Sequence, residues 1–271
     1  MKLNSLKKIS ALAVVSAVSL GVAVAGPSNP APTSAPIDSG SVPPPPPPSG
    51  GGGGLFDSMG MTLSAGYDTD YIFRGYDLGH DYAWTALDLS IPLGDSLEAS
   101  LGVWYTDAFN DSPGNEIDLY ASLAQDFGAF GVEIGYIHYA YPDAGNGPES
   151  NEAYISAGTT VGPLDVSLAY YHDFDLEVSY VEAAATTSIP LSSAVSLDPS
   201  IGISYADIDD APAGVEDSGF NHFFARLDLS IQLTDSATLT PYVATSSALD
   251  VAEDFGEDDY LWGGVSLSVD F

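Results

Sequence analysis

The feature that most constrains the fold is an apolar side chain at every second position, which recurs from residue 61 to residue 271. In the segment 225–233, ARLDLSIQL, one alanine, three leucines and one isoleucine alternate with Arg226, Asp228 and two further polar residues. A period of two places apolar and polar side chains on opposite faces of a β-strand, whereas a helical stripe needs a period near 3.6. No segment shows a helical stripe, so we expect an all-β chain.

Turn signals divide this region into twelve expected strands. They are 61–75, 82–93, 97–107, 116–127, 129–141, 152–162, 164–174, 176–191, 195–206, 220–233, 237–247 and 260–271. Tight connections at 94–96, 128, 162–163, 192–194 and 234–236 alternate with longer, mostly acidic ones at 76–81, 108–115, 142–151, 207–219 and 248–259, with a brief exception near Asp175. Strands of about 11 residues suit a tilted membrane span better than a soluble β-sandwich, the alternative for an all-β chain. We therefore predict a transmembrane, antiparallel, up-and-down β-barrel of about 12 strands with both termini periplasmic.

Aromatic residues gather near the ends of the expected strands. Those near the longer connections are Tyr67, Tyr71, Tyr105, Tyr136, Tyr170 and Tyr205, and those near the tight ones are Phe127, Phe130 and Phe271. Outer-membrane barrels carry aromatic girdles of this kind at both membrane interfaces. The terminal phenylalanine also resembles the signature by which outer-membrane barrels are recognised, which implies barrel-assembly machinery as a partner of the last strand.

Residues 1–58 lack the alternation. Three lysines precede a short apolar run and a small-x-small site before Gly26, the pattern of a cleaved signal peptide over residues 1–25. A transmembrane anchor is the alternative, but the apolar run is short for a bilayer span. Residues 26–58 are rich in proline and glycine and predict a disordered linker, followed by a barrel domain over residues 59–271.

The charge of the chain excludes one class of partner. Without the three lysines of the signal peptide, Arg74 and Arg226 face 38 acidic residues, a formal charge of −36. Such a chain would be repelled by nucleic acid. Its natural partners are cations, or else the carboxylates keep the surface hydrated in a salty medium. We expect no cofactor beyond divalent cations held loosely at external loops.

The polar parity of the strands predicts which residues line the barrel. On the first strand the expected outward set is Met61, Leu63, Ala65, Tyr67, Thr69, Tyr71 and Phe73. The pore-lining candidates are Asp68, Asp70, Arg74, Asp88, Glu98, Asp118, Glu133, Asp165, Asp198, Arg226 and Asp228. Small inward residues such as Gly102, Gly135 and Ser122 predict room in the lumen of a twelve-stranded barrel. The acidic lining favours cations, unless the carboxylates pair through water around a plugged bore.

The segment AGYDTDYIFRGYDLG (residues 65–79) resembles the opening of the TorF-type porin family, whose first strand carries a Tyr/Phe-Arg-Gly element. The matching residues are Tyr71, Phe73, Arg74 and Gly75. The family has Ser- and Gln-rich residues after the glycine, whereas this chain has Tyr76-Asp77-Leu78-Gly79. The linker and the extreme acidity depart from the family as well. The resemblance implies a porin-like role and no particular solute.

Histidines and acidic loops are the candidates for other chemistry. Enzymatic barrels need a histidine beside a serine or an aspartate, and this chain has His80, His138, His172 and His222, all near the longer connections. No serine or aspartate lies at a spacing that singles out one of them. Weak candidate ligands for a metal ion are Asp207, Asp209, Asp210, Glu216 and Asp217, which lack the order of an EF-hand loop.

These patterns predict an outer-membrane, porin-like channel for passive diffusion of small solutes or ions, with a preference for cations. The alternatives are a structural or surface-interaction barrel with a closed lumen and metal-binding loops, and an outer-membrane barrel hydrolase. Outer-membrane lipid is an expected partner, and a homo-oligomer is compatible with these patterns. For Arg74 we expect carboxylates on the second and twelfth strands as partners, so that it either locks the barrel seam or shapes entry at the external mouth.

Overall fold

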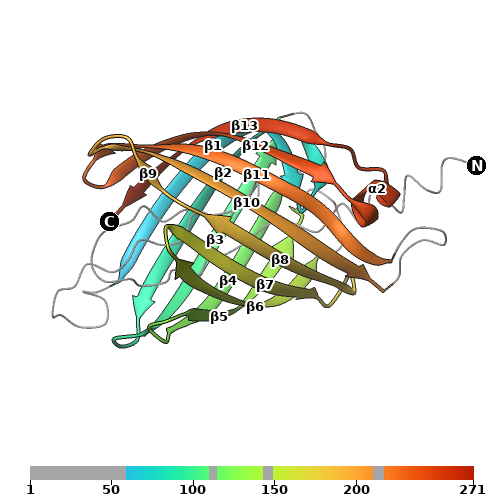
Figure 1. Cartoon of the computed structure of the whole chain (residues 1–271), viewed down its shortest axis with the longest axis horizontal. Coiled ribbons are helices and arrows are strands. Elements are labelled where there is room, and N and C mark those ends of the chain that lie inside the picture. Colours follow the sequence, from blue (N-terminus) through green and yellow to red (C-terminus); the bar gives the residue numbers. More distant parts are fainter. Residues whose placement is uncertain (1–58, 110–114, 143–148, 210–216) are drawn as a thin grey trace, which may run out of the picture.

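Antiparallel strands close into a single barrel (Figure 1). The structure is a computed structural model that describes residues 59–109, 115–142, 149–209 and 217–271. The strands are β1 (Gly60–Phe73), β2 (Tyr76–Pro92), β3 (Leu97–Ala108), β4 (Glu116–Asp126), β5 (Gly131–Ala140), β6 (Ser150–Val161), β7 (Leu164–Asp173), β8 (Val178–Thr186), β9 (Ile189–Pro190), β10 (Val195–Ile208), β11 (Ser218–Thr234), β12 (Ala237–Ala248) and β13 (Tyr260–Asp270). The expected signal peptide and linker, residues 1–58, lie outside the described residues.

As predicted, twelve strands form the barrel wall when β8 and β9 are counted as one. β8 and β9 are two parts of the expected strand 176–191, and both pair with β10. The remaining strands follow one another around the barrel in chain order. β1 and β13 pair from Thr62↔Asp270 to Asp68↔Gly264 and close the sheet. Closure satisfies the backbone groups that an open sheet would leave at its edges.

The five connections predicted as tight lie at one end of the barrel, and the remaining connections lie at the other (Figure 1). Both ends of the barrel domain meet at the tight-turn end, where the Phe271 N–H donates to the Met61 carbonyl oxygen over 2.9 Å. One expected connection is wrong. Residues 76–81 belong to β2, and a two-residue turn at Arg74 and Gly75 joins β1 to β2. Both residues have positive φ, 49° and 88°, as a type I′ hairpin turn requires. Arg-Gly is not the Asn-Gly or Asp-Gly pair that signals this turn in a sequence.

The connection between β12 and β13 contains a short helix, α2 (Asp250–Phe255), that the sequence pattern did not predict. Its three apolar residues, Val251, Ala252 and Phe255, are buried, and Gly256 ends it with a φ of 92°. Six residues are too few to establish a helical period in a sequence. No helix in the described ranges is long and apolar enough to cross a bilayer.

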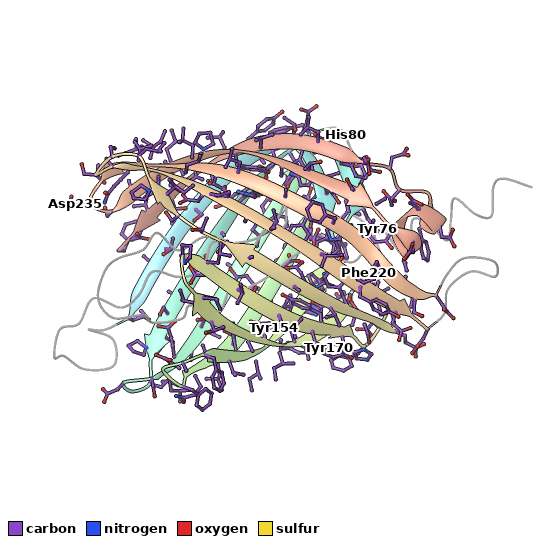
Figure 2. All side chains as sticks on the ribbon, in the orientation of Figure 1. Tyr76, His80, Tyr154, Tyr170, Phe220 and Asp235 are labelled. Atoms are coloured by element: carbon purple, nitrogen blue, oxygen red, sulfur yellow. The ribbon has the colours of Figure 1, made fainter. Side chains whose placement is uncertain are left out.

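The outer face of the barrel is apolar and carries aromatic residues near both ends. Exposed aliphatic side chains recur around it, among them Leu63, Leu101, Leu119, Ile134, Ile155, Leu168, Ile201 and Val265. Figure 2 shows Tyr170 and Phe220 pointing outward near the long-loop end, with Asp235 at the opposite end. Tyr67, Tyr136 and Tyr205 are exposed as expected, as are Phe127, Phe130 and Phe271. Tyr105 is half-buried, and Tyr71 departs furthest from the expectation, because only 3% of it is exposed.

Inside the barrel, aromatic rings lie over glycines of the adjacent strand. Five such cross-strand pairs are Gly66↔Trp84, Gly102↔Tyr120, Gly135↔Tyr154, Gly202↔Phe224 and Tyr242↔Gly264. A Cβ added at Gly102 or Gly135 would lie 2.1 Å or 2.3 Å from the facing tyrosine ring. The inward glycines therefore do not leave the open space that the sequence suggested. They are the places where large side chains cross the neighbouring backbone.

Candidate functional site in the barrel interior

The β1–β2 hairpin bends into the barrel at its long-loop end. The pairing of β1 with β2 shifts register between Asp70 and Ile72, and Asp81 in β2 has a φ of 55°. A bulge of this kind bends a strand and strengthens its twist. The consecutive residues Tyr71, Ile72 and Phe73 are all at most 3% exposed, so both faces of the hairpin are covered. We call residues 71–77 the hairpin tip. The expected outward placement of Tyr71 and Phe73 is wrong, because the strand leaves the barrel wall before them.

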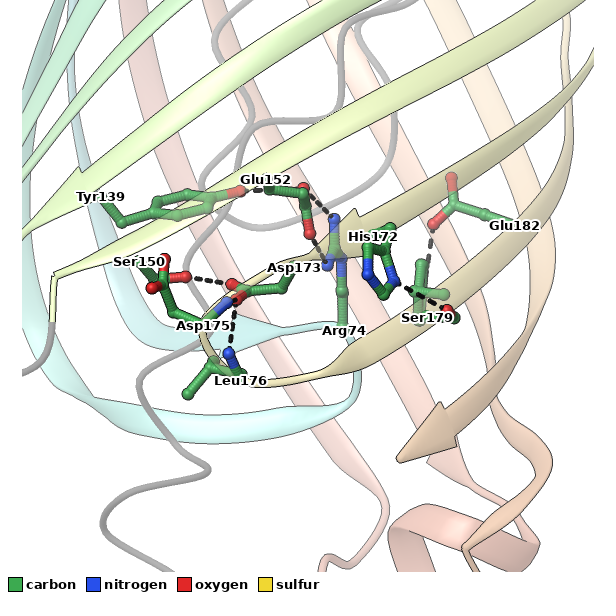
Figure 3. Close-up of polar contacts among 11 residues, drawn as sticks. Arg74, Tyr139, Ser150, Glu152, His172, Asp173, Asp175, Leu176, Ser179 and Glu182 are labelled. Atoms are coloured by element: carbon green, nitrogen blue, oxygen red, sulfur yellow. Dashed lines mark hydrogen bonds and ion pairs between the residues drawn. The ribbon is translucent and has the colours of Figure 1, made fainter. Parts of the chain in front are cut away.

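Arg74 at the turn of the hairpin tip reaches across the interior. Its Nη1 and Nη2 atoms donate to the two carboxylate oxygens of Glu152 on β6 over 2.8 Å and 2.9 Å (Figure 3). The rings of Tyr171 and Tyr180 each lie 4.5 Å from its guanidinium carbon. The expected partners on the second and twelfth strands are wrong. Glu152 lies five strands from β1 around the barrel. Parity arguments consider only adjacent strands and cannot detect such a contact.

The backbone of the hairpin tip is bonded to the opposite wall as well. The Asn221 side-chain amide on β11 donates to the Arg74 carbonyl oxygen over 2.6 Å, and the Tyr76 hydroxyl donates to the Asn221 amide oxygen over 3.2 Å. A left-handed conformation at a non-glycine residue costs about 1–3 kcal/mol and persists only where its surroundings enforce it. At Arg74 the ion pair and the bond from Asn221 supply that enforcement. A small cavity of about 30 Å³ beside them is lined by residues including Phe73, Leu78 and Ile208.

The loop after α2 supports the hairpin tip from the mouth. The Tyr76 ring meets the Phe255 ring edge-on with centroids 6.2 Å apart. The Asp77 N–H and the Tyr260 hydroxyl donate to one Glu257 carboxylate oxygen over 3.1 Å and 2.7 Å. Burial raises the pKa of Glu257, and these two hydrogen bonds oppose that rise. The long-loop end of the barrel is thus closed over by contacts between elements far apart in the chain.

Inward carboxylates deeper in the barrel accept hydrogen bonds from aromatic side chains. Asp68 receives the Trp84 indole N–H over 2.7 Å and the Tyr242 hydroxyl over 2.5 Å. Tyr120 donates to Asp88 over 2.5 Å. Each of these three rings lies over one of the inward glycines described above. Tyr154 donates to Glu133 over 2.6 Å in the same manner. The rings therefore fill space and also satisfy buried charge.

The structure places the remaining pore-lining candidates in three settings. Asp198 is buried and accepts hydrogen bonds from three serines. Arg226 forms an ion pair with Asp228 over 2.7 Å, and its guanidinium carbon lies 3.6 Å from the Tyr242 ring centroid. Glu98 is half-buried. Asp70 binds the exposed His80 over 2.6 Å at the mouth, and Asp165 is exposed beside Thr160 at the tight-turn rim. Asp118 is fully buried.

Sequence reasoning missed several buried interior groups. They are Glu116, Glu152, Asp173, Glu182 and Asn221. Strand parity could have found at least three of them, because Glu116 shares the parity of Asp118, Glu152 that of the inward Ser156, and Asp173 that of Asp165. Asn221 lies where β11 shifts register against β10, between the pairs of Ile203 and Tyr205, so the simple alternation fails there.

Inside the barrel, one histidine and one serine among the described residues lie within hydrogen-bond distance of each other. His222 Nδ1 lies 2.8 Å from the Ser246 hydroxyl oxygen, and its Nε2 lies 2.8 Å from the Tyr180 hydroxyl oxygen. His222 and Ser246 are 2% and 1% exposed. A nucleophile must meet its substrate, and these two groups are covered by protein. The pair therefore tethers β11, β12 and β8 to one another. His138 and His172 lie on the outer side, where they are hydrogen-bonded to Asn151 and Ser179.

The candidate metal ligands are not assembled into a site in the described part of the chain. Asp210 and Glu216 lie outside the described residues, while Asp207, Asp209 and Asp217 flank that gap. Within the described ranges, no group of three or more histidine, aspartate or glutamate side chains could hold a metal ion.

Comparison with known proteins identifies the family. Residues 57–216 match the model of a family described as "Bacterial protein of unknown function (Gcw_chp)", which spans the chain from β1 to β10. The chain belongs to the Gcw_chp family. The family description names no activity, so its members' function has to be argued from the barrel. None of the curated proteins compared matches the sequence.

Two solved structures share the fold of this Gcw_chp protein. The structure described as "KdgM porin in complex with disordered oligogalacturonate" matches with a TM-score of 0.52 and 12% identity, over 78% of this chain and 99% of that one. The structure described as "KdgM porin" matches with a TM-score of 0.51 and 11% identity over the same shares. At this identity the likeness shows the fold alone, a barrel of the kind that outer-membrane porins use.

Proposed function

We propose that this protein is a porin-like channel of the outer membrane, of the TorF type, for passive diffusion of small solutes or ions with a preference for cations. The observation that carries the proposal is the contrast between the two faces of the barrel. Aliphatic and aromatic side chains cover the outside, while many carboxylates and hydroxyls are buried inside together with Arg74 and the largely covered Arg226. This is the arrangement of a barrel that faces lipid and encloses a polar interior.

The orientation in the membrane follows from the connections. The tight turns and both ends of the barrel domain face the periplasm, and the longer acidic connections face outward. Phe271 at the end of the last strand suits recognition by the barrel-assembly machinery. Lipid head groups bridged by divalent cations would meet the acidic connections at the outer rim.

The preference for cations rests on the charge of the interior. Buried carboxylates such as Asp68, Asp88, Glu133 and Asp198 outnumber the two arginines, and each arginine is neutralised by its own carboxylate partner. The KdgM porin structure contains an oligogalacturonate, whose uronate groups are anionic. An acidic interior would repel such a ligand, so we propose that this protein passes cations or neutral solutes in place of acidic sugars.

Planar-bilayer recording tests this function directly. The purified protein should give discrete single-channel currents, and a tenfold KCl gradient should produce a reversal potential of the sign for a cation-selective pore. The conductance should be small, because the hairpin tip crosses the long-loop mouth. An absence of channels would overturn the proposal, and a reversal potential of the opposite sign would overturn the cation preference.

One observation favours an alternative to the channel, a structural barrel with a closed lumen. Arg74, Tyr76 and Asn221 tie the hairpin tip to the opposite wall. If the tip never leaves this position, the protein would serve as an anchor or a surface-interaction barrel. The bilayer recording separates the two functions, because a closed barrel gives no single-channel currents.

The hydrolase alternative makes a different prediction. Ser246 should not react with a fluorophosphonate probe, since the Ser246–His222 pair is covered by protein. Mass spectrometry of the treated, folded barrel should find Ser246 unmodified, and a serine hydrolase treated in parallel serves as the control for probe reactivity. Stoichiometric labelling of Ser246 in the folded protein would support the hydrolase alternative.

A further inference from the structure

The β1–β2 hairpin leaves the barrel wall at a hinge. The ladder between β1 and β13 ends at Asp68, and the ladder between β2 and β3 ends at Tyr82. The outer flanks of residues 69–81 therefore carry no ladder pairing in the described part of the chain, and the register shift between Asp70 and Ile72 lies within this segment. Segments with few backbone partners open at a low free energy. The position of the hairpin tip thus depends on individual side-chain contacts.

His80 connects the two sides of this hinge through its imidazole ring. Its Nδ1 atom lies 2.6 Å from Asp70 Oδ1, before the register shift, and its Nε2 atom lies 3.7 Å from Asp77 Oδ2 in the hairpin tip. Asp70 pairs with His80 in the ladder, whereas Asp77 pairs with Ile72 beyond the shift. A neutral imidazole has one N–H, and only the imidazolium presents an N–H to both carboxylates. The two contacts together, which we call the His80 bridge, therefore require a proton on the ring.

Solvent protons reach the ring directly. The His80 side chain is 61% exposed (Figure 2), and those of Asp70 and Asp77 are 27% and 26% exposed. Asp81 is a further carboxylate whose charge acts on the ring, and Glu257 in the loop after α2 faces Asp77. These carboxylates repel one another across the hinge when His80 is neutral. The protonated ring supplies the positive charge that holds them together.

We propose that protonated His80 holds the hairpin tip across the long-loop mouth and that deprotonation releases it, so that the channel opens as the pH rises. This regulation rests on the proposed function, whereas the His80 bridge itself depends only on the fold. Asp70 through its hydrogen bond and Asp77 through its charge raise the pKa of His80 above its ordinary value. The bridge is therefore complete below about pH 6.5 and is lost as the pH rises through the raised pKa.

Trypsin cleavage at Arg74 at two pH values tests the His80 bridge. His80→Gln removes the charge at an exposed position, and comparison with wild type at the same pH cancels the pH dependence of trypsin itself. At pH 6 and about 0.1 M salt, H80Q should be cleaved about twofold to fivefold faster than wild type, as expected for exposed ion pairs. At pH 9 the two rates should be equal. Equal rates at both pH values, or the same excess at both, would overturn the inference.

His138→Gln is the matched control. His138 also lies at the long-loop end, where its Nε2 atom is 3.9 Å from a Glu149 carboxylate oxygen and its Nδ1 atom is 3.0 Å from Asn151 Oδ1. Both partners belong to β6 or the residue before it, away from the hairpin tip. H138Q should therefore be cleaved at the wild-type rate at both pH values. An increase at pH 6 as large as that of H80Q would overturn the inference, because loss of any rim histidine would then have the same effect.

Planar-bilayer recording separates this regulation from the proposed function. The open probability of the wild type should rise between pH 6 and pH 9, and H80Q should show the pH 9 value at both. A wild type that conducts without this dependence would overturn the regulation and leave the channel standing. A wild type without currents at either pH would overturn the channel together with its regulation, and the trypsin comparison would still decide whether the His80 bridge holds the hairpin tip.

Discussion

Arg74→Gln should raise the single-channel conductance and lower the free energy of unfolding by about 3–5 kcal/mol, the usual cost of removing one partner of a buried ion pair. The substitution leaves the Glu152 carboxylate buried, 0% exposed, and without its cationic partner, although the Tyr139 hydroxyl still donates to it over 3.1 Å. It also removes the guanidinium that holds the hairpin tip across the interior. Single-channel recording measures the first effect, and chemical denaturation in detergent or lipid measures the second.

Arg226→Gln is the matched control for this prediction. Arg226 is a second arginine inside the barrel, with its side chain 11% exposed, but its partner Asp228 lies two residues away on the same strand, so the pair holds no distant element. R226Q should therefore cost stability without raising conductance. The double variant R74Q/E152Q should recover part of the stability and keep the higher conductance, since no charge is left unpaired. A conductance rise of equal size in R226Q would contradict a specific role of the hairpin tip.

Proteolysis offers an independent measure of the same contact. Arg74 and Arg226 are the only lysine or arginine residues after Lys8, so trypsin has two sites in residues 9–271. The wild-type barrel should resist cleavage at Arg74, which is 5% exposed. Glu152→Gln should release the hairpin tip and yield a fragment that begins at Gly75. Cleavage at Arg74 in the folded wild type at the same rate would show that the ion pair does not hold the tip.

Gly135→Val should be among the most damaging single substitutions in the barrel wall. A Cβ at position 135 would lie 2.3 Å from the Tyr154 ring, so the ring must leave its place on the backbone of β5. Overpacking costs about 1–3 kcal/mol, and the displaced tyrosine would also lose its 2.6 Å bond to Glu133, a charge-assisted bond of about 1.5–3 kcal/mol. We expect a loss of about 3–5 kcal/mol in the free energy of unfolding, measured by urea titration of the barrel in lipid.

Two further variants separate the cost of overpacking at position 135 from the cost of losing the Tyr154–Glu133 hydrogen bond. Tyr154→Phe keeps the ring over Gly135 and removes only the hydroxyl, so it should cost no more than the hydrogen bond. The double variant G135V/Y154A should be more stable than G135V alone, because the space for the valine side chain is restored. Wild-type stability in G135V would show that the tyrosine ring is not confined by the glycine backbone.

Most of the fold was predictable because every strand of a membrane barrel alternates apolar outward side chains with polar inward ones. The alternation in segments such as 225–233 gave the strand count, and the alternation of tight and longer connections gave the topology. The prediction failed where the rule stops applying. The alternation of inward and outward side chains ends at the register shift between Asp70 and Ile72. The sequence pattern therefore assigned Tyr71 and Phe73 to the outer face, and it assigned residues 76–81 to a loop although they belong to β2.

The candidate site was predictable only in part. Parity assigned Asp68, Asp88, Asp118 and Glu133 to the inward face, because the side chains of a strand can point in only two directions, and the structure buries all four. It could not show that Tyr120 and Tyr154 would lie over Gly102 and Gly135, because that depends on which residues face each other in register. A small residue in a sequence indicates room for a side chain, and the structure decides whose side chain fills it.

The sequence by itself therefore determined the barrel, its two faces and the sign of its interior charge, since these depend on local alternation and composition. Only the tertiary structure decided what Arg74 does. Its partner Glu152 is 78 residues away in the chain and five strands away around the barrel. The two meet because a bulge turns the β1–β2 hairpin inward. A contact across a closed barrel depends on the curvature of the whole sheet, and no local pattern records it.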